Sequence, residues 1–258
     1  MGAQSAEELE VFLDFLKSMC RLLIECGCSS NRVENLCEKL GAAFNMEIEA
    51  LAIPTGVWLS VRKNRHHTTD LVRIKSWSVN LTRLSQVNDL VEKISANSLD
   101  IHAATIELKK IQSSSDPFKP VVTTLASGGA SAVLVFLYGG IVSEIVIAFF
   151  LGVFVDIFNK YATDRESRRY LADFLSAALT TLLCVMASHL LPGLNMPRLI
   201  IGGIILMVPG LVLVNAVHEI AQKNLVSGTA RLVEALMISA SLASGVILVI
   251  AISQTMFS

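Results

Sequence analysis

The chain has 258 residues, of which 53% are hydrophobic and 17% charged, and its formal net charge is −1. A balance this close to neutral excludes the overall positive field that favours nucleic acid, so no nucleic-acid partner is expected. The apolar share exceeds that of ordinary soluble domains. Fourteen of the 21 Lys and Arg residues lie in residues 1–119, and the other seven lie in the longer remainder. The sequence therefore predicts a polar N-terminal half and a membrane half.

Four of the five cysteines, Cys20, Cys26, Cys28 and Cys37, lie within the first 40 residues. The chain opens on the polar, acidic segment MGAQSAEELEVF rather than on a signal peptide, so we do not expect a secreted disulfide scaffold. The spacing C-x5-C-x-C-x8-C lacks the paired C-x2-C typical of zinc sites. These cysteines are predicted to be reduced thiols on helix faces, and no metal or cofactor is predicted.

Residues 1–112 change from helical to strand periodicity and back. A first helix is expected at residues 7–25, and a second begins near Asn31, which we expect to form a reciprocal capping pair with Glu34. Alternating residues within 46–75, with Pro54-Thr55-Gly56 as a turn, predict three strands. Helices at residues 79–96 and 99–112 complete a cytoplasmic α+β domain of the order ααβββαα.

No catalytic constellation is recognisable in this domain. His66 and His67 stand beside Arg65 in a segment that resembles a polar turn, and His102 is alone on a helix. No nucleophile–base order, phosphate-binding loop or paired metal ligands accompany them. A solvated loop explains the two histidines more simply than a metal or proton-relay role. The protein is not predicted to be an enzyme. The Ser- and Pro-rich segment 113–120 is the expected linker.

Beyond the linker, five apolar segments approach the ~20 residues that a membrane-spanning helix needs. Glu144 and Asp156 lie near the two ends of the second segment, and His189 is the ionisable residue of the third. We expect an all-α transmembrane domain over residues 121–258, with spans at about 121–138, 141–158, 174–191, 199–217 and 235–256.

The basic residues of the membrane half gather in the connections after the second and fourth segments: Lys160, Arg165, Arg168, Arg169, Lys223 and Arg231. The turns after the first and third segments contain only Arg198. Because short positively charged loops stay in the cytoplasm, this pattern predicts a multi-pass protein of the cell inner membrane, with its N-terminus in the cytoplasm and its C-terminus outside. Five spans are the odd number that this orientation requires.

The first apolar segment contains ASGGASA, in which Ser127 and Ser131, and likewise Gly128 and Ala132, are small residues four positions apart. Such spacing lets helices approach closely in lipid. We expect close helix packing here, with a substrate-facing groove as the alternative.

The fourth segment, LIIGGIILMVPGLVLVNAV, is broken by Pro209-Gly210 and leads into Asn215, His218 and Glu219. In lipid, a helix break survives only where protein or a water-filled cavity covers the freed backbone groups. The three polar residues lie within about a turn of one another and are expected to share a face. The segment predicts a discontinuous helix that binds a solute. The alternative is a tolerated kink that leaves His218 and Glu219 at the interface.

Helix N-termini and cationic side chains suit a carboxylate substrate. The predicted substrate-binding residues are Pro209, Gly210, Asn215, His218 and Arg231. Proton coupling is assigned to acids, because burial and exposure shift a carboxylate pKa in opposite directions. The predicted coupling acids are Glu219, Asp156 and Glu234. For Glu219 the alternative is an exposed pair with Lys223, four residues later.

Six motifs, in chain order, resemble the threonine/serine exporter (ThrE-type) family, and more closely its shorter YjjP-like members: SSNRVENLCEKLGAAF, IPTGVWLSV, TDLVRI, NLTRLSQVNDLV, VPGLVLVNA and VSGTARLVEALM. The resemblance implies a cytoplasmic domain followed by five spans. His218-Glu219 stands where the family often has Arg-Asp, which keeps the carboxylate. Lys223-Asn224 stands where it often has Gly-Asp, which loses an acid.

Fused members of this family carry a second membrane domain, which does not follow here before Ser258. The resemblance therefore implies the larger subunit of a split two-component exporter, with a smaller YjjB-like membrane subunit as partner and a higher oligomer as a further expectation. Split pairs are associated with succinate, and fused relatives with threonine and serine. We expect an exporter of small carboxylate solutes, foremost a dicarboxylate such as succinate. The alternatives are a threonine/serine exporter subunit and a membrane-anchored sensor that uses the soluble domain.

Overall fold

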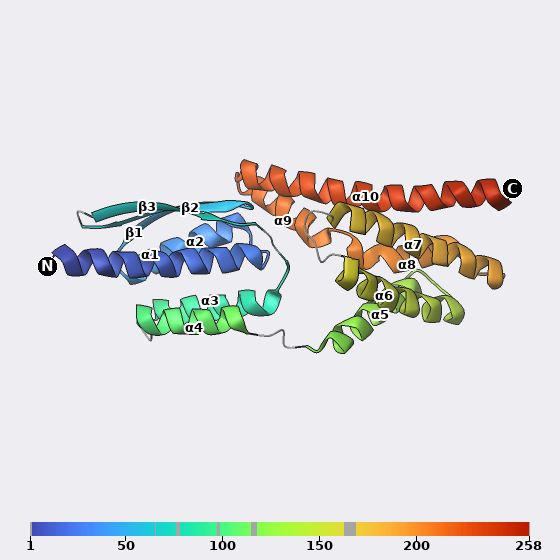
Figure 1. Ribbon diagram of the computed structural model, residues 1–258, viewed down its shortest axis with the longest axis horizontal. Coiled ribbons are helices and arrows are strands. Elements are labelled where there is room, and N and C mark those ends of the chain that lie inside the picture. Colours follow the sequence, from blue (N-terminus) through green and yellow to red (C-terminus); the bar gives the residue numbers. More distant parts are fainter. Residues whose placement is uncertain are drawn as a thin grey trace. The chain divides into compact units, whose positions relative to one another are not determined.

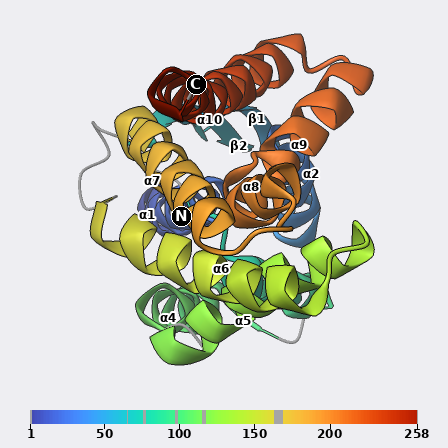
Figure 2. The same ribbon diagram turned by 90° about the vertical axis from the view of Figure 1, so that its right-hand side faces the viewer.

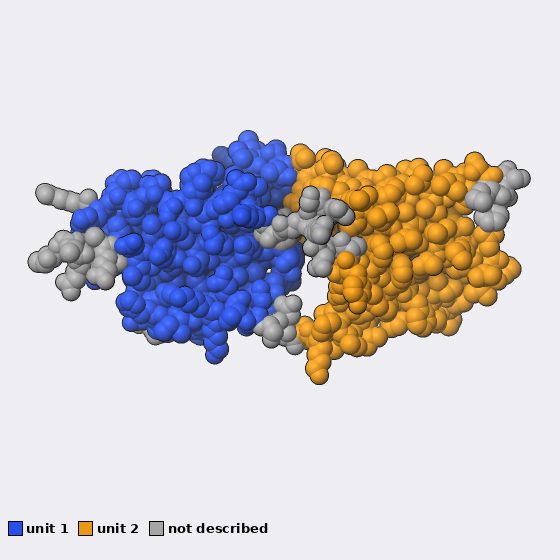
Figure 3. Space-filling model, in the orientation of Figure 1, with its two compact units in different colours: residues 1–117, 214–232 blue, residues 118–213, 233–258 orange. Residues whose placement is uncertain are grey.

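The computed structural model describes residues 2–64, 66–75, 78–96, 99–114, 118–162 and 169–257. The chain forms two compact units (Figure 3): unit 1 comprises residues 1–117 and 214–232, and unit 2 comprises residues 118–213 and 233–258. Residues 115–117 of the expected linker and 163–168 of the expected cytoplasmic connection lie outside the described residues. The sequence analysis assigned residues 214–232 to the membrane domain, whereas here they cluster with the N-terminal domain.

Unit 1 contains the predicted order of two helices, three strands and two helices. These elements are α1 (Gly2–Glu25), α2 (Ser30–Ala43), β1 (Glu47–Ile53), β2 (Gly56–Lys63), β3 (His66–Arg73), α3 (Leu81–Ser95) and α4 (Ile101–Ser113). The strands form an antiparallel sheet in the order β1-β2-β3. The N-terminal α+β fold is thus the one that periodicity predicted.

Helix α1 occupies the middle of this domain. Figure 1 shows it between the sheet and the pair α3–α4, and it contacts elements of both layers. Its apolar residues are buried on most of its circumference, with Phe12, Leu16 and Leu23 almost inaccessible. In β2, Val57, Leu59 and Val61 point into the same core, while Trp58 between them is exposed. The strand alternation therefore directs one face of the sheet onto the helices.

His66 and His67 begin β3, so their assignment to a polar turn was wrong. They pair with Lys63 and Arg62 of β2, and a nitrogen of the His67 ring lies 2.9 Å from Ser60 Oγ. The preceding hairpin turn is tight because Asn64 adopts a φ of 57°, a conformation that Asn tolerates better than most residues. Pairing therefore resumes at once, and two polar residues continue the ladder.

Most of unit 2 is helical, and two of its helices, α9 and α10, also contribute residues to unit 1. The elements are α5 (Pro120–Leu137), α6 (Val142–Ala162), α7 (Arg169–Leu190), α8 (Met196–Ile204), the 3-10 turn η2 (Ile205–Met207), α9 (Gly210–Ala221) and α10 (Leu225–Phe257). Helix α8 packs among α5, α6 and α7 (Figure 2).

Four helices, α5, α6, α7 and α10, are long and apolar enough to cross a membrane. The segments Met196–Met207 and Gly210–Ala221 are bent by 60° at the break between them, and the total within the described residues reaches five only if they form one broken span. The helix break at Pro209-Gly210 is confirmed. The five-span arrangement and its orientation stay predictions.

Small residues set the contact between α5 and α6. A Cβ atom added to Gly128 would lie 2.8 Å from the carbonyl oxygen of Phe149, and one added to Gly152 would lie 2.4 Å from Ser131 Oγ. Only glycine allows the backbones this close. The predicted role of ASGGASA in close helix packing is confirmed. By contrast, a Cβ on Gly129 would meet no atom within 4 Å.

We predict that Gly128→Leu destabilises the α5–α6 pair and that Gly129→Leu does not. Both substitutions add the same side chain to adjacent positions of one helix, but only the first forces it into a neighbouring backbone. Overpacking of this kind costs about 1–3 kcal/mol. Thermal unfolding of the detergent-purified chain should show a lower apparent Tm for Gly128→Leu alone, and equal values for the two variants would contradict the observed packing.

Candidate functional site

An ion pair between Glu219 of α9 and Arg231 of α10 is buried inside unit 1. Arg231 Nε lies 3.2 Å from Glu219 Oε1, and the two residues are 3% and 0% exposed. Both were predicted site residues, but the sequence did not indicate that they pair. Charges withdrawn from water are tolerated only when they are paired and hydrogen-bonded. Each of these two side chains therefore depends on the other.

The same ion pair binds the backbone at the start of α2. Ser30 N donates a 2.8 Å hydrogen bond to Glu219 Oε1, and Arg231 Nη2 donates one of 2.8 Å to the carbonyl oxygen of Cys28. The first amides of a helix have no partner within it, and the helix dipole favours a negative charge beside them. Glu219 thus satisfies the N-terminus of α2 from 189 positions away in the sequence.

The reciprocal capping pair expected between Asn31 and Glu34 is wrong. The cap residue of α2 is Ser29, whose side chain makes no capping hydrogen bond. Glu34 Oε1 instead accepts a 2.8 Å hydrogen bond from Ala52 N at the end of β1, and Asn31 Nδ2 donates to Gln222 Oε1. Helix α2 begins at Ser30, so Asn31 lies inside its first turn and not at the cap position.

Ser227 of α10 and Glu34 of α2 lie beside the Glu219–Arg231 pair, and each forms a hydrogen bond with the backbone of Ala52. Ser227 of α10, which is fully buried, donates a 3.1 Å hydrogen bond from Oγ to the carbonyl oxygen of Ala52. Burial raises the pKa of Glu34, and the nearby carboxylates of Glu38 and Glu219 raise it further, while the Ala52 amide opposes the shift. The turn between α9 and α10 is therefore joined by polar contacts to both α2 and β1. None of Ser30, Glu34 or Ser227 was identified as part of a site from the sequence.

The other predicted substrate-binding residues lie in different surroundings. His218 is exposed and its ring nitrogen lies 3.0 Å from Gln222 Nε2, whereas Asn215 is half-buried. His218 and Glu219 therefore do not share a face. In unit 2, Pro209 is buried and Gly210 is exposed at the first position of α9.

The alternative that Glu219 pairs with Lys223 on a wet helix surface is wrong, because Glu219 is buried against Arg231. Lys223 adopts a φ of 68° just beyond α9, where its backbone N–H and that of Asn224 close the helix end. That left-handed conformation is typical of a helix C-terminus.

Two of the predicted coupling acids belong to unit 2, and both are paired. Asp156 lies 2.5 Å from Lys160 Nζ and accepts a 2.5 Å hydrogen bond from Thr124 Oγ1 of α5. Glu234 of α10 lies 3.5 Å from Arg169 Nη1 of α7. The pair of Glu234 and Arg169 connects α10 to α7, whereas Asp156 pairs within α6 and reaches α5 through Thr124. Whether either acid carries a proton stays a prediction.

Glu144 is 1% exposed and links two turns at one end of unit 2. Its carboxylate accepts hydrogen bonds of 3.1 Å from Ile141 N and 2.6 Å from Asn195 N, and it lies 3.3 Å from Arg198 Nη1. Arg198, the isolated basic residue of the sequence analysis, is therefore a partner of this acid.

Sequence reasoning missed Asp173 of α7. Its Oδ2 atom is buried and has no hydrogen-bond partner among the described residues. The third span was expected to begin at Phe174, one residue later, so Asp173 fell outside it. The signal was available, because Asp173 is the single acidic residue between Arg169 and Leu190.

The cysteines provide no metal site. Cys20, Cys26, Cys28 and Cys37 are buried and free, as expected, with the sulfurs of Cys20 and Cys37 3.4 Å apart. Burial raises the pKa of the Cys28 thiol to about 11, which leaves it protonated and unreactive at neutral pH. Within the part of the chain that the structure describes, no group of three or more His, Cys, Asp or Glu residues is placed to hold a metal ion.

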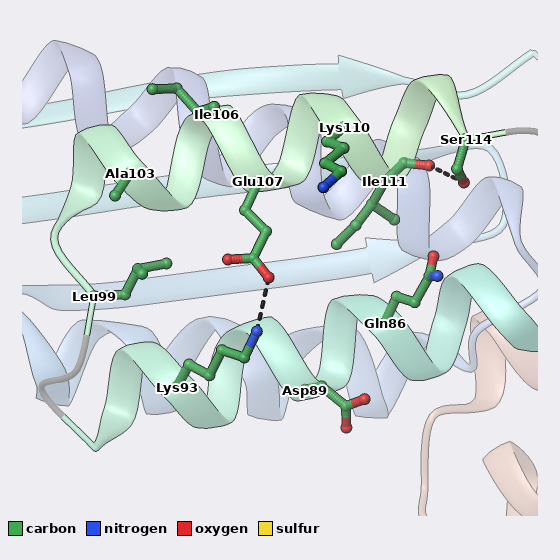
Figure 4. Close-up of a pocket in the computed structure, with 10 residues that line it drawn as sticks. All are labelled: Gln86, Asp89, Lys93, Leu99, Ala103, Ile106, Glu107, Lys110, Ile111 and Ser114. Carbon is green, nitrogen blue, oxygen red and sulfur yellow. Dashed lines mark hydrogen bonds and ion pairs between the residues drawn. The ribbon is translucent and has the colours of Figure 1, made fainter.

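A groove with a volume of about 640 Å³ runs between α3 and α4 (Figure 4). Lys93 of α3 forms a 2.8 Å ion pair with Glu107 of α4 across it, and Lys110 points into the space between the helices. The apolar residues Leu99, Ala103 and Ile111 contribute to its lining. The sequence analysis found no polar constellation in this region, because the groove arises only when two helices are placed together.

Comparison with known proteins connects these observations to a family. A family model described as "Putative threonine/serine exporter" matches residues 14–253. Among curated relatives, an uncharacterised Schizosaccharomyces pombe protein, C16A10.01, is 23% identical over 91% of this chain and 29% of its own length. Pheromone-regulated membrane protein 10 of Candida glabrata is 23% identical over 91% of this chain and 30% of its own.

A "Probable threonine/serine exporter" of Mycobacterium tuberculosis is 21% identical over 68% of this chain and 33% of its own length. The chain thus spans about a third of the length of the curated relatives it matches. No solved structure matches it significantly.

We predict that Arg231→Met strongly destabilises unit 1, because it leaves the Glu219 carboxylate buried without its counter-charge. Removing one partner of a buried ion pair costs about 3–5 kcal/mol. Urea unfolding of the detergent-solubilised chain, followed by circular dichroism, measures the loss. Lys223→Met removes a neighbouring surface charge and is the matched control.

The double variant Glu219→Met/Arg231→Met should recover part of that stability, since it leaves no buried charge but removes the partners of Ser30 N and of the Cys28 carbonyl. If the single variant Arg231→Met were as stable as the Lys223→Met control, the pair of Glu219 and Arg231 would not be buried in the detergent-solubilised chain.

Proposed function

This chain belongs to the threonine/serine exporter family, and from that membership we propose that it forms part of a membrane exporter of small carboxylate solutes. The observation that carries the proposal is the apolar segment α8–η2–α9, bent by 60° at the break that contains Pro209. Transporters use such discontinuous helices to place backbone donors and acceptors at a solute. An uninterrupted helix would offer none.

Substrate binding is proposed at the start of α9. Gly210 is the first residue of this helix and leaves open space at its Cα. Its own amide donates to the carbonyl oxygen of Val208, so the amides that a ligand can approach are the two that follow it. Helix N-termini favour anions, and a carboxylate is the anion shared by the candidate solutes. Asn215 and His218, further along α9, are additional candidates. Arg231 can take part only when its pair with Glu219 opens, because the guanidinium is otherwise engaged.

The candidate solutes differ in what supports them. The family description and the name of the mycobacterial relative refer to threonine and serine. The likeness to split-type members favours a dicarboxylate, foremost succinate. Proton coupling is proposed for Asp156 and Glu234 in unit 2. It is proposed for Glu219 only when the pair of Glu219 and Arg231 opens.

The proposed exporter includes a second membrane component, a smaller YjjB-like subunit, in the inner membrane. Solute sites of repeat-built transporters form where two repeats meet, so a single membrane domain of this kind leaves its site open on one side. Higher oligomers of the pair are compatible with this arrangement.

A second candidate function is regulation through the soluble domain. The groove between α3 and α4 favours it, because the groove combines an apolar floor with the charged groups of Lys93, Glu107 and Lys110. Export ranks first because the helix break lies in the apolar segment and not in this domain.

We predict that cells expressing this chain together with the smaller subunit export radiolabelled succinate, and that either subunit alone does not. Threonine and serine are measured in parallel, since faster efflux of either would assign the amino-acid substrate instead. Pro209→Ala, which restores a helical N–H, should reduce efflux to background. Pro192→Ala, in the turn before α8, is the matched control. Efflux of all three solutes at the level of empty cells would overturn the proposed function.

Orientation in the membrane is tested separately. Reporter fusions after residue 115 should report the cytoplasm, and fusions after Ser258 should report the outside, if α8–η2–α9 is one broken span. A cytoplasmic C-terminus would show that this segment re-enters the membrane and leaves on the same side, which gives four spans.

A further inference from the structure

One acid of unit 2 stands apart from the others. Among the described acidic residues of this unit, Glu144, Asp156 and Glu234 each face a cationic side chain within 4 Å. Asp173 is half-buried and forms no such ion pair with the described residues, and its buried Oδ2 atom has no hydrogen-bond partner among them. An anionic oxygen in this state is costly at membrane depth, where ionisable residues are functional candidates by default.

The basic residue that precedes Asp173 in the described part of α7 is already engaged. Arg169 lies four residues earlier on α7, one helical turn away, and its Nη1 atom is 3.5 Å from Glu234 Oε1 of α10. One guanidinium therefore serves two carboxylates, Glu234 directly and Asp173 along its own helix. Within the described residues, one positive charge faces two carboxylates, and binding of one proton balances the group.

In the part of the chain that the structure describes, the other elements that pack on α7 supply no further cation to Asp173. On α6, Asn159 Oδ1 accepts a 2.6 Å hydrogen bond from Ser176 Oγ, one turn beyond Asp173, and Lys160 is held by Asp156. Helix α8 carries Arg198, which faces Glu144. On α10 the charged neighbour is Glu234 itself.

We propose that Asp173, Arg169 and Glu234 form the proton-exchange site of the exporter, with Asp173 as the acid that binds the proton. When Asp173 is protonated, Arg169 remains with Glu234 and the ion pair joins α7 to α10. When Asp173 releases its proton to water, its carboxylate attracts Arg169 and weakens that link. Proton binding thus changes the contact between two helices, which is the kind of two-state element that coupling requires.

The helix contact concerned is a close one. A Cβ atom added to Gly245 of α10 would lie 2.4 Å from the carbonyl oxygen of Phe174, the residue that follows Asp173. The two backbones therefore touch beside the acid, and a change in the ion pair acts where α7 and α10 have least room to adjust. This inference rests on the proposed export function, but its first test does not.

The first test is infrared spectroscopy of the full chain in liposomes between about pH 5 and pH 8, a range in which an ordinary carboxyl is already ionised. The carboxylic acid C=O band should be present at the lower pH and reduced at the higher. Asp173→Asn should remove it, whereas Glu144→Gln, the matched amide change of an arginine-paired acid on α6, should leave it. A band that survives Asp173→Asn unchanged would overturn the proposal.

The second test measures transport by the chain with its smaller subunit. In Asp173→Asn, efflux driven by a pH gradient should be lost while exchange of labelled for unlabelled solute continues. Asp173→Glu, which keeps a carboxyl group, should restore pH-driven efflux and retain the infrared band. A Glu variant that lacks both the efflux and the band would overturn the assignment, even if the Asn variant did not fold. If the wild-type pair shows no exchange at all, the proposed function fails, and the infrared result still decides the role of Asp173.

Discussion

Unit 1 depends on a carboxylate that reaches the start of α2 from a distant part of the chain. Glu219 satisfies the amide of Ser30 and neutralises Arg231, and Arg231 in turn donates to the carbonyl of Cys28. Each group is buried, so none of them can turn to water if its partner is removed. Residues 214–232, although they lie between apolar segments in the sequence, are consequently part of the fold of the N-terminal domain.

Local patterns predicted those parts of the fold that depend on local forces. The order ααβββαα follows from hydrophobic periodicity, and the packing of α5 on α6 follows from Gly128 and its small neighbours. The polar pair His66-His67 resembled a loop because polarity was the only local signal. Strand pairing overrode it, since the tight turn at Asn64 fixes the register and carries both residues into β3.

The ion pairs could not be predicted in the same way. For Glu219, the rule that residues four apart on a helix interact indicated Lys223, whereas the true partner is Arg231 on the next helix. The capping pair expected for α2 failed because Glu34 is drawn to the Ala52 amide of β1, and the acceptor for Ser30 comes from 189 positions away. Charge compensation in a core is decided by tertiary contacts, and one sequence does not reveal which of several acids and bases will meet.

Asp173 illustrates a related limit of hydropathy. An apolar segment is chosen to exclude charged residues, so the expected third span begins at Phe174 and leaves out Asp173. Helix α7 nevertheless begins at Arg169 and contains this acid. Asp173 is half-buried, and the remaining exposure of an acid favours exchange of its proton with water. On α10, Arg231 and Glu234 are three residues apart and thus about one helical turn from each other. One turn of this helix therefore contains Arg231, which pairs with Glu219, and Glu234, which pairs with Arg169. Residues of two different charge groups thus stand one turn apart on α10, and the order of charges along the sequence does not reveal to which group each belongs.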